Sequence, residues 1–180
     1  MFKKLLKSLA KALAAQQIPY MVMGGQAVLL YGEPRMTKDI DVTLGLGVDG
    51  QNLIRNLAAG LGLTPLADAS FTSRTMVFPC VDEKSGIRVD FIFSWSAYER
   101  EALGRTRTVD LEGVPIRFAS PEDLILQKVI AGRPRDEEDI RGVLAKNPDC
   151  DRAYIRRWLR EFTDSLGEPF VERFEQWDKR

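Results

Sequence analysis

Three aspartates are the residues of this sequence whose type and spacing could do chemistry. Asp39 and Asp41 lie in an apolar run at positions 39–42, and Asp90 lies in a second apolar run at 89–92. Side chains of a strand alternate between its two faces, so Asp39 and Asp41 share one face. Two carboxylates 4 Å apart repel by about 4 kcal/mol at an effective dielectric constant of about 20. A third carboxylate at the same place needs a compensating charge, and Mg²⁺ fits because it prefers carboxylate and phosphate oxygens.

Each aspartate also has a purely structural interpretation. Asp39 and Asp41 could be solvated residues at a strand end, and Asp90 could lie on the wet face of a half-buried strand. The pair Gly24-Gly25, which follows an apolar run fourteen positions before Asp39, favours the functional interpretation. A strand that turns into a helix presents backbone N–H groups to a phosphate, and glycine lets the phosphate come close.

A second concentration of charge follows an apolar helical pattern near position 128. Lys128 has apolar neighbours, so its side chain could extend along them to solvent or could point at phosphate oxygens. Arg133 and Arg135 could also contact phosphate, or could simply pair with Asp136 and Asp139. The sequence leaves these alternatives open.

The composition limits the chemistry that this protein can perform. There is no histidine, which excludes histidine general bases, Ser-His-Asp systems and His-ligated zinc. The two cysteines, Cys80 and Cys150, are far apart and indicate neither a disulfide framework nor a thiolate zinc site. Lys plus Arg and Asp plus Glu both number 26, so no overall basic field attracts nucleic acid. Catalysis would have to use carboxylates, Lys, Arg, hydroxyls and bound metal.

The periodicity of apolar residues predicts an α/β (α+β) fold, a mixed β-sheet flanked by helices with a helical C-terminal third. Ser120-Pro121 is a strong helix start, with Ser as N-cap and Pro at the first helical position. We therefore expect an α/β core at residues 1–119 and a helical part packed on it at 120–180. The predicted strands lie at 18–23, 39–44, 75–81, 87–93, 107–111 and 114–118, and the predicted helices of the core begin near residues 2, 26, 51 and 96.

No apolar run approaches the 18 residues of a membrane span, so we expect a cytoplasmic protein with no membrane partner. The first segment places Phe2, Leu5, Leu6, Leu9 and Leu13 at helical spacing, with lysines mostly on the other faces. Such a basic amphipathic helix could touch a membrane or RNA. The simpler expectation is a first helix packed on the domain with its lysines in solvent.

Taken together, these motifs resemble a known superfamily. Gly24-Gly25, Asp39-Ile40-Asp41 and Val89-Asp90-Phe91 resemble the signature of the polymerase-β-type nucleotidyltransferases. The segment 32–38 and the charged segment 128–139 are similar to minimal bacterial nucleotidyltransferases of the AbiEii toxin-like group. The resemblance covers roughly residues 18 to 140. Gly-Gly replaces the superfamily's common Gly-Ser turn, which removes a hydroxyl that could contact phosphate.

The resemblance implies a nucleoside triphosphate (NTP) substrate and Mg²⁺ or Mn²⁺ as the cofactor. By this resemblance Asp39, Asp41 and Asp90 would hold two metal ions, and Asp90 could also accept the proton of the acceptor hydroxyl. Gly24 and Gly25 would cradle the β- and γ-phosphates.

The same resemblance assigns roles to three charged residues elsewhere in the sequence. Lys128 would be catalytic and, with Arg35, would neutralise charge on the transferring group. Arg35, Lys128 and Asp136 would all help to bind the nucleotide.

The predicted function is metal-dependent transfer of a nucleoside monophosphate (NMP) from an NTP to an acceptor. Among relatives the acceptor is tRNA, a protein or a small molecule, and the resemblance does not choose between them. A toxin role with a cognate antitoxin as partner is part of the same prediction. Two alternatives are a nucleotide- or RNA-binding module without turnover, and a structural α/β protein whose acids are ordinary surface residues.

Overall fold

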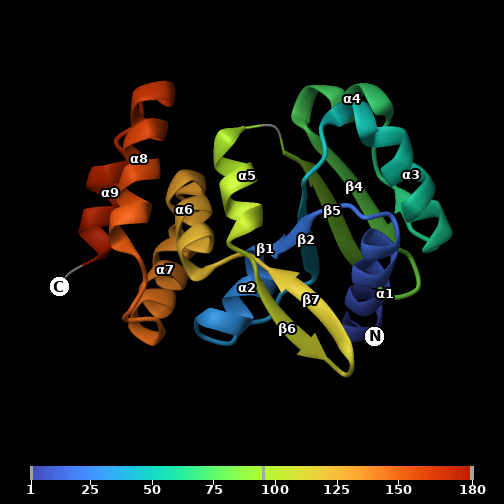
Figure 1. The fold of residues 1–180 in the computed structure, drawn as a ribbon, viewed down its shortest axis with the longest axis horizontal. Helices are drawn as coiled ribbons and strands as arrows, with labels where there is room; N and C mark the ends of the chain where they lie inside the picture. The colour runs from blue at the N-terminus through green and yellow to red at the C-terminus, as the bar shows by residue number, and fades with distance from the viewer. Residues whose placement is uncertain (1, 95, 179–180) are drawn as a thin grey trace. The chain divides into compact units, whose positions relative to one another are not determined.

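The computed structural model describes residues 2–94 and 96–178 of the chain, which is a mixed α/β protein. Figure 1 shows strands and helices interspersed up to β7, followed by helices alone. The chain divides into two compact units, residues 2–26 with 36–119 and residues 27–35 with 120–178. The predicted packing of the C-terminal helices on the core stays a prediction. Within the described residues, no helix is both long and apolar enough to span a membrane.

The first unit contains a seven-stranded sheet with strand order β3-β4-β5-β2-β1-β7-β6. The pairs β1–β7 and β2–β5 are parallel and the other neighbours are antiparallel, which confirms the predicted mixed sheet. The strands are β1 (Tyr20–Met23), β2 (Asp39–Leu44), β3 (Thr64–Pro65), β4 (Val77–Asp82), β5 (Ile87–Phe93), β6 (Arg107–Leu111) and β7 (Val114–Phe118).

The helices of the sheet-containing part follow the predicted pattern with one exception. They are α1 (Phe2–Ala15), α2 (Gly24–Tyr31), α3 (Gln51–Gly60) after a 3₁₀ turn (Val48–Gly50), α4 (Ala69–Thr75) and α5 (Ala97–Gly104). The first helix buries Leu6, Leu9 and Leu13 and packs on β7, which agrees with the simpler expectation for this segment.

Helix α4 was not predicted from the sequence, which instead indicated a strand from Thr75. Asp68 caps this helix, because its side chain accepts a hydrogen bond of 2.7 Å from the backbone N–H of Phe71. Met76 then takes a left-handed conformation with φ of 60° and ends the helix, so that β4 begins only at Val77. Asp is a favoured N-cap residue, so Asp68 was the signal in the sequence that could have predicted this helix.

Alternation along β2 and β5 explains why the three aspartates are more accessible than the apolar residues beside them. Ile40 and Val42 of β2 are fully buried, as are Val89 and Phe91 of β5. The residues between them, including the three aspartates, are exposed or half-buried. The apolar residues therefore anchor both strands in the core and leave the aspartates on the accessible face.

The second unit is built from α6 (Pro121–Ala131), α7 (Pro134–Lys146), α8 (Arg152–Leu166) and α9 (Phe170–Trp177), together with residues 27–35. Ser120 caps α6 as predicted, accepting a hydrogen bond from the backbone N–H of Asp123. Gly132 ends α6 in a left-handed conformation with φ of 59°.

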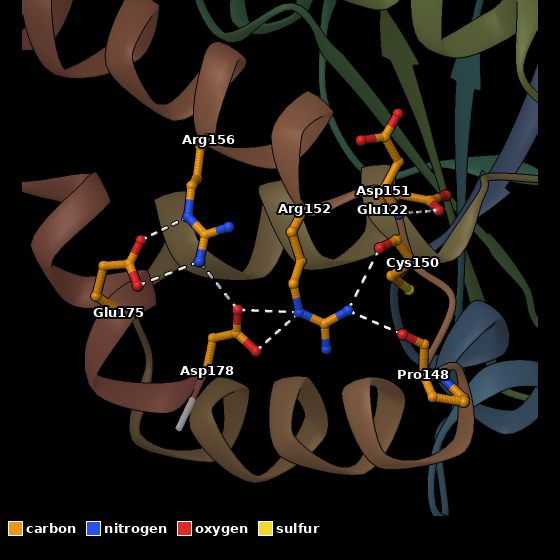
Figure 2. Close-up of polar contacts among 8 residues, drawn as sticks. All are labelled: Glu122, Pro148, Cys150, Asp151, Arg152, Arg156, Glu175 and Asp178. Atoms are coloured by element: carbon orange, nitrogen blue, oxygen red, sulfur yellow. Dashed lines mark hydrogen bonds and ion pairs between the residues drawn. The ribbon is translucent and has the colours of Figure 1, made fainter. Parts of the chain in front are cut away.

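Ion pairs hold α9 against α8, and Figure 2 shows them. Arg152 donates from Nε to both carboxylate oxygens of Asp178 at 3.0 Å. Arg156 donates to Glu175 at 2.6 Å and to Asp178 at 3.3 Å. Arg152 also donates to the carbonyl oxygen of Pro148 at 2.9 Å, so one guanidinium joins the end of α9 to the loop before α8. These contacts connect α8, the end of α9 and the loop before α8.

Candidate active site

The pairing of β2 with β5 brings together the three aspartates that the sequence predicted to be functional. The two strands run parallel, and Asp41 lies directly opposite Asp90 in the register. Paired residues of neighbouring strands point to the same face, and Asp39 shares the face of Asp41 by alternation. All three carboxylates therefore belong to one face of the sheet. We call Asp39, Asp41 and Asp90, with Arg88, the aspartate face.

Arg88 adds a positive charge to this face. It lies two residues before Asp90 on β5 and opposite Asp39 of β2. Its Nε donates a hydrogen bond of 2.8 Å to Oδ1 of Asp90. The hydrogen bond and charge of Asp90 raise the pKa of the Arg88 guanidinium, and the charges of Asp39 and Asp41 act in the same direction. All three carboxylates thus act electrostatically on one guanidinium.

The glycine turn lies against the same face. Gly24 follows β1 directly, begins α2 and has a φ of 60°, a conformation that favours glycine. A Cβ atom on Gly24 would lie 1.9 Å from Oδ2 of Asp41, so a larger residue would collide with this carboxylate. A Cβ atom on Gly25 would lie 2.6 Å from Oγ1 of Thr37. Both glycines are therefore required by side chains at or just before β2.

The donor set of the aspartate face fits a divalent cation in its chemistry. It supplies carboxylate oxygens from neighbouring strands, and a cationic side chain already lies beside them. Within the described ranges 2–94 and 96–178, no group of three or more Asp, Glu or Cys side chains is arranged closely enough to hold a metal ion. Asp90 is instead engaged by Arg88, so its carboxylate would have to turn toward a metal ion that it shared with Asp41.

Charged residues of the helical unit form a cluster in which Lys128, Asp136 and Asp139 are buried and Arg35 is half-buried. Lys128 lies 2.6 Å from Oδ1 of Asp136 and 2.6 Å from Oδ2 of Asp139. Arg35 makes a bidentate pair with Asp139, at 2.9 and 3.0 Å. Asp136 also accepts a hydrogen bond of 3.1 Å from the backbone N–H of Arg133. We call Arg35, Lys128, Asp136 and Asp139 the buried ion network.

Burial and pairing decide how this network behaves. Only 9% of the Lys128 side chain and 5% of the Asp139 side chain are exposed. Burial raises the pKa of Asp139, but hydrogen bonds and charge from Arg35 and Lys128 outweigh it, so the pKa lies below its ordinary value. Arg35 and Lys128 therefore hold the Asp139 carboxylate in its charged form.

The structure adds three residues that the sequence did not single out as part of a site. Arg88 could have been found from its spacing, because positions 88 and 90 of a strand share a face. Asp139 could have been found from its position three residues after Asp136 on a helix. Thr37, whose hydroxyl lies under Gly25, gave no comparable signal in the sequence.

Solved structures of nucleotidyltransferases share this fold. The antibiotic-resistance factor ANT(2'')-Ia aligns with a TM-score of 0.65 and 19% identity, over 92% of this chain and 94% of that chain. An antigenic nucleotidyltransferase-like protein from Paracoccidioides brasiliensis aligns with a TM-score of 0.58 and 17% identity, over 92% and 88%. The lincosamide antibiotic adenylyltransferase LnuA, in its lincomycin-bound form, aligns with a TM-score of 0.57 and 15% identity, over 78% and 94%. These similarities establish the fold.

The sequence comparison establishes the family. No curated protein matches the sequence. The family described as "Nucleotidyltransferase of unknown function (DUF6036)" matches over residues 2–154. This confirms the predicted resemblance to nucleotidyltransferases, whereas the AbiEii toxin-like group stays a prediction. Since the match spans the sheet, the aspartate face and the buried ion network, the chain belongs to the DUF6036 family of nucleotidyltransferases.

Proposed function

We propose that this protein transfers an NMP from an NTP to a hydroxyl group of an acceptor, with Mg²⁺ or Mn²⁺ as the cofactor. The observation that carries the proposal is the parallel register of β2 and β5, which pairs Asp41 with Asp90 on the face that also carries Asp39. Family membership and the nucleotidyltransferase fold support the reaction class.

Each of the three aspartates would have its own role in the reaction. Asp39 and Asp41 would hold the metal ions, and Asp90 would share one of them. The metal, when bound, would neutralise charge on the triphosphate and favour ionisation of the acceptor hydroxyl. Asp90 would accept the proton of that hydroxyl. The acceptor oxygen would bond to the α-phosphorus of the NTP, and the bond from that phosphorus to pyrophosphate would break.

The glycine turn would hold the leaving part of the nucleotide. Backbone N–H groups at the start of α2 would donate hydrogen bonds to the β- and γ-phosphates, where the helix dipole also favours negative charge. Gly24 would serve a second purpose, because the space that its missing side chain leaves is taken by the Asp41 carboxylate. The triphosphate turn and the metal ligands would thus be positioned together.

Nucleotide contacts by Arg35, Lys128 and Asp136 are a further part of the proposal. Arg35 is the more accessible cation, with 21% of its side chain exposed against 9% for Lys128. Lys128 is held by two carboxylates at 2.6 Å, so its proposed action on phosphate would require at least one of these pairs to open.

The acceptor is proposed only as a class, a hydroxyl on tRNA, a protein or a small molecule. One structural neighbour is described as an antibiotic-resistance factor and another as a lincosamide antibiotic adenylyltransferase, which supports testing antibiotics first among small molecules. A toxin role is a narrower proposal, and it predicts that expression of the active protein arrests growth while an Asp41→Asn variant does not.

The test is incubation with each of the four NTPs, labelled at the α-phosphate, with Mg²⁺ or Mn²⁺ and with tRNA, cell protein, an aminoglycoside or lincomycin. Transfer of label to one acceptor, with release of pyrophosphate, is expected for the wild-type protein. Asp41→Asn should abolish it, whereas Asp49→Asn, an equal change of charge at an exposed position, should not. Nucleotide binding without pyrophosphate release under any condition would instead support the non-catalytic alternative.

A further inference from the structure

Arg88 is the residue of the aspartate face for which the proposed reaction gives no role. Its Nε bonds to Oδ1 of Asp90, the carboxylate to which metal binding and proton transfer are assigned. In the register of the sheet it is also the direct neighbour of Asp39. The Arg88 guanidinium thus lies on the same face as all three aspartates and is hydrogen-bonded to Asp90, which is on its own strand.

The pair formed by Arg88 and Asp90 can open. Arg88 has 49% of its side chain exposed and Asp90 has 19%, so water can replace each partner. Ion pairs this exposed are weak, and salt screens them. The backbone N–H of Arg88 bonds separately to the carbonyl oxygen of Lys38, at 3.2 Å. The strand is therefore anchored by its backbone, and the guanidinium can leave Asp90 without disturbing the sheet.

We propose that Arg88 is a built-in competitor for the divalent cation: it pairs with Asp90 in the metal-free protein and is displaced when metal binds together with NTP. This inference rests on the proposed function. Arg88 occupies Oδ1 of Asp90, and its positive charge would repel a metal ion bound beside it, so Arg88 lowers the affinity for metal alone. A triphosphate changes this balance, because it offers metal ligands and a new anionic partner for the displaced guanidinium.

This role makes metal binding depend on the nucleotide. If Arg88 must leave Asp90, then NTP raises the affinity for metal in part by accepting the guanidinium, and metal raises the affinity for NTP by the same factor. The protein would then hold metal weakly until substrate arrives. A purely structural ion pair on the surface of a strand would produce no such coupling.

The experiment compares Mn²⁺ binding by wild type, Arg88→Gln and Arg141→Gln, followed by the electron paramagnetic resonance signal of unbound Mn²⁺. Arg141 is a matched control, since it is 51% exposed and pairs with one carboxylate, that of Glu137, at 2.6 Å. At about 50 mM salt and without nucleotide, Arg88→Gln should bind Mn²⁺ about fivefold more tightly than wild type, and Arg141→Gln should match wild type. With an NTP analogue that cannot be cleaved after the α-phosphate, the difference in Mn²⁺ affinity between wild type and Arg88→Gln should become smaller.

A second variant separates charge from folding defects. Arg88→Lys keeps the positive charge without the Nε–H donor, so its Mn²⁺ affinity should lie between those of wild type and Arg88→Gln. Thermal unfolding should show that both variants remain folded. Equal or weaker Mn²⁺ binding by Arg88→Gln overturns the inference even if transfer activity is intact. Failure of every variant to bind Mn²⁺, with or without nucleotide, overturns the proposed function and this inference with it.

Discussion

The aspartate face and the buried ion network use the same residue types in opposite ways. The aspartate face places three carboxylates beside one guanidinium on an accessible side of the sheet. The buried ion network pairs two carboxylates with two cations, and Lys128, Asp136 and Asp139 are each buried. Carboxylates grouped around one half-exposed cation can accept another cation. Carboxylates matched by buried cations mainly hold helices together.

This difference predicts that substitutions in the two regions have different consequences. In the aspartate face, removing a carboxylate should damage the reaction and leave the fold intact, because these three side chains are exposed or half-buried. In the buried ion network, removing one partner leaves a buried charge uncompensated, so the fold should suffer first. The contrast can be tested by measuring activity and stability for variants of each region.

The largest effect is expected for Asp41→Asn. Loss of this carboxylate should lower the transfer rate about a thousandfold or more, because it would remove a ligand of the proposed metal site and cost several kcal/mol of transition-state stabilisation. The melting temperature should change little, since asparagine keeps the size of the side chain at this half-buried position. Steady-state kinetics and calorimetry would measure both. If Asp41→Asn kept a tenth of the wild-type transfer rate, Asp41 could not be a ligand of the proposed metal site.

A large loss of stability is expected for Lys128→Met. The substitution keeps the packing of the aliphatic stem but leaves Asp136 and Asp139 without the ammonium that lies 2.6 Å from each. Breaking a buried pair in this way costs about 3–5 kcal/mol. Urea unfolding would give the free energy of unfolding.

The matched control for Lys128 is Lys146→Met. Lys146 also belongs to the helical unit, and it pairs with Glu33 at 3.1 Å, but 46% of its side chain is exposed. Its loss should cost less than about 1 kcal/mol. Equal losses of unfolding free energy in Lys128→Met and Lys146→Met would show that the buried ion network stabilises the fold no more than a surface ion pair does.

A smaller and more local effect is expected for Gly24→Ala. Both Gly24→Ala and the control Gly86→Ala force a side chain into a left-handed conformation, with φ of 60° and 68°, at a cost of about 1–2 kcal/mol. Only Gly24→Ala also pushes a methyl group into the Asp41 carboxylate, since nothing lies within 4 Å of the corresponding position at Gly86.

The two glycine variants should therefore lose similar stability but differ in activity. Gly24→Ala should lower the transfer rate well beyond Gly86→Ala, and should weaken Mn²⁺ binding because Asp41 is displaced. A pair of variants with the same activity would show that the glycine turn does not position the aspartate face.

Much of this architecture could be predicted because its signals are local. Alternation predicted that Asp39 and Asp41 share one face, and the Ser120 cap predicted the start of α6. The strands predicted at 107–111 and 114–118 are β6 and β7, which pair as a hairpin. The pairing of Asp41 with Asp90 depends on which strands become neighbours, and only the resemblance to a family suggested it.

The state of each charge could not be predicted in the same way. Whether Lys128 faces phosphate or carboxylates depends on how α7 folds back after Gly132, because its partners lie eight and eleven residues further along the chain. Whether Asp90 forms an ion pair depends on the conformation of the Arg88 side chain. The two-residue spacing of Arg88 and Asp90 permits this contact but does not require it. Sequence patterns can identify the residues of a site. Only the tertiary structure shows which of these charged side chains form ion pairs with other residues.

The smallest effect is expected in the pH dependence of stability, through Asp139. Its pKa lies below the ordinary value despite burial, because Arg35 and Lys128 hold the carboxylate in its charged form. A carboxyl group with a depressed pKa in the folded state stabilises the protein above its unfolded-state pKa of about 4, and this contribution is lost as the pH falls through the folded-state pKa. Asp139→Asn removes the titrating group, so the stability gap between wild type and variant should be widest at neutral pH.

Urea unfolding of wild type and Asp139→Asn, from neutral pH down through about pH 3, would measure this gap. It should narrow as the solution becomes more acidic than about pH 4. Glu137→Gln is the matched control, because Glu137 also pairs with an arginine but 42% of its side chain is exposed, and its gap should be small at every pH. A gap for Asp139→Asn that stays constant over this range would mean that the ion pairs of Asp139 do not lower its pKa. The contrast between the buried ion network and the aspartate face would then rest on burial alone.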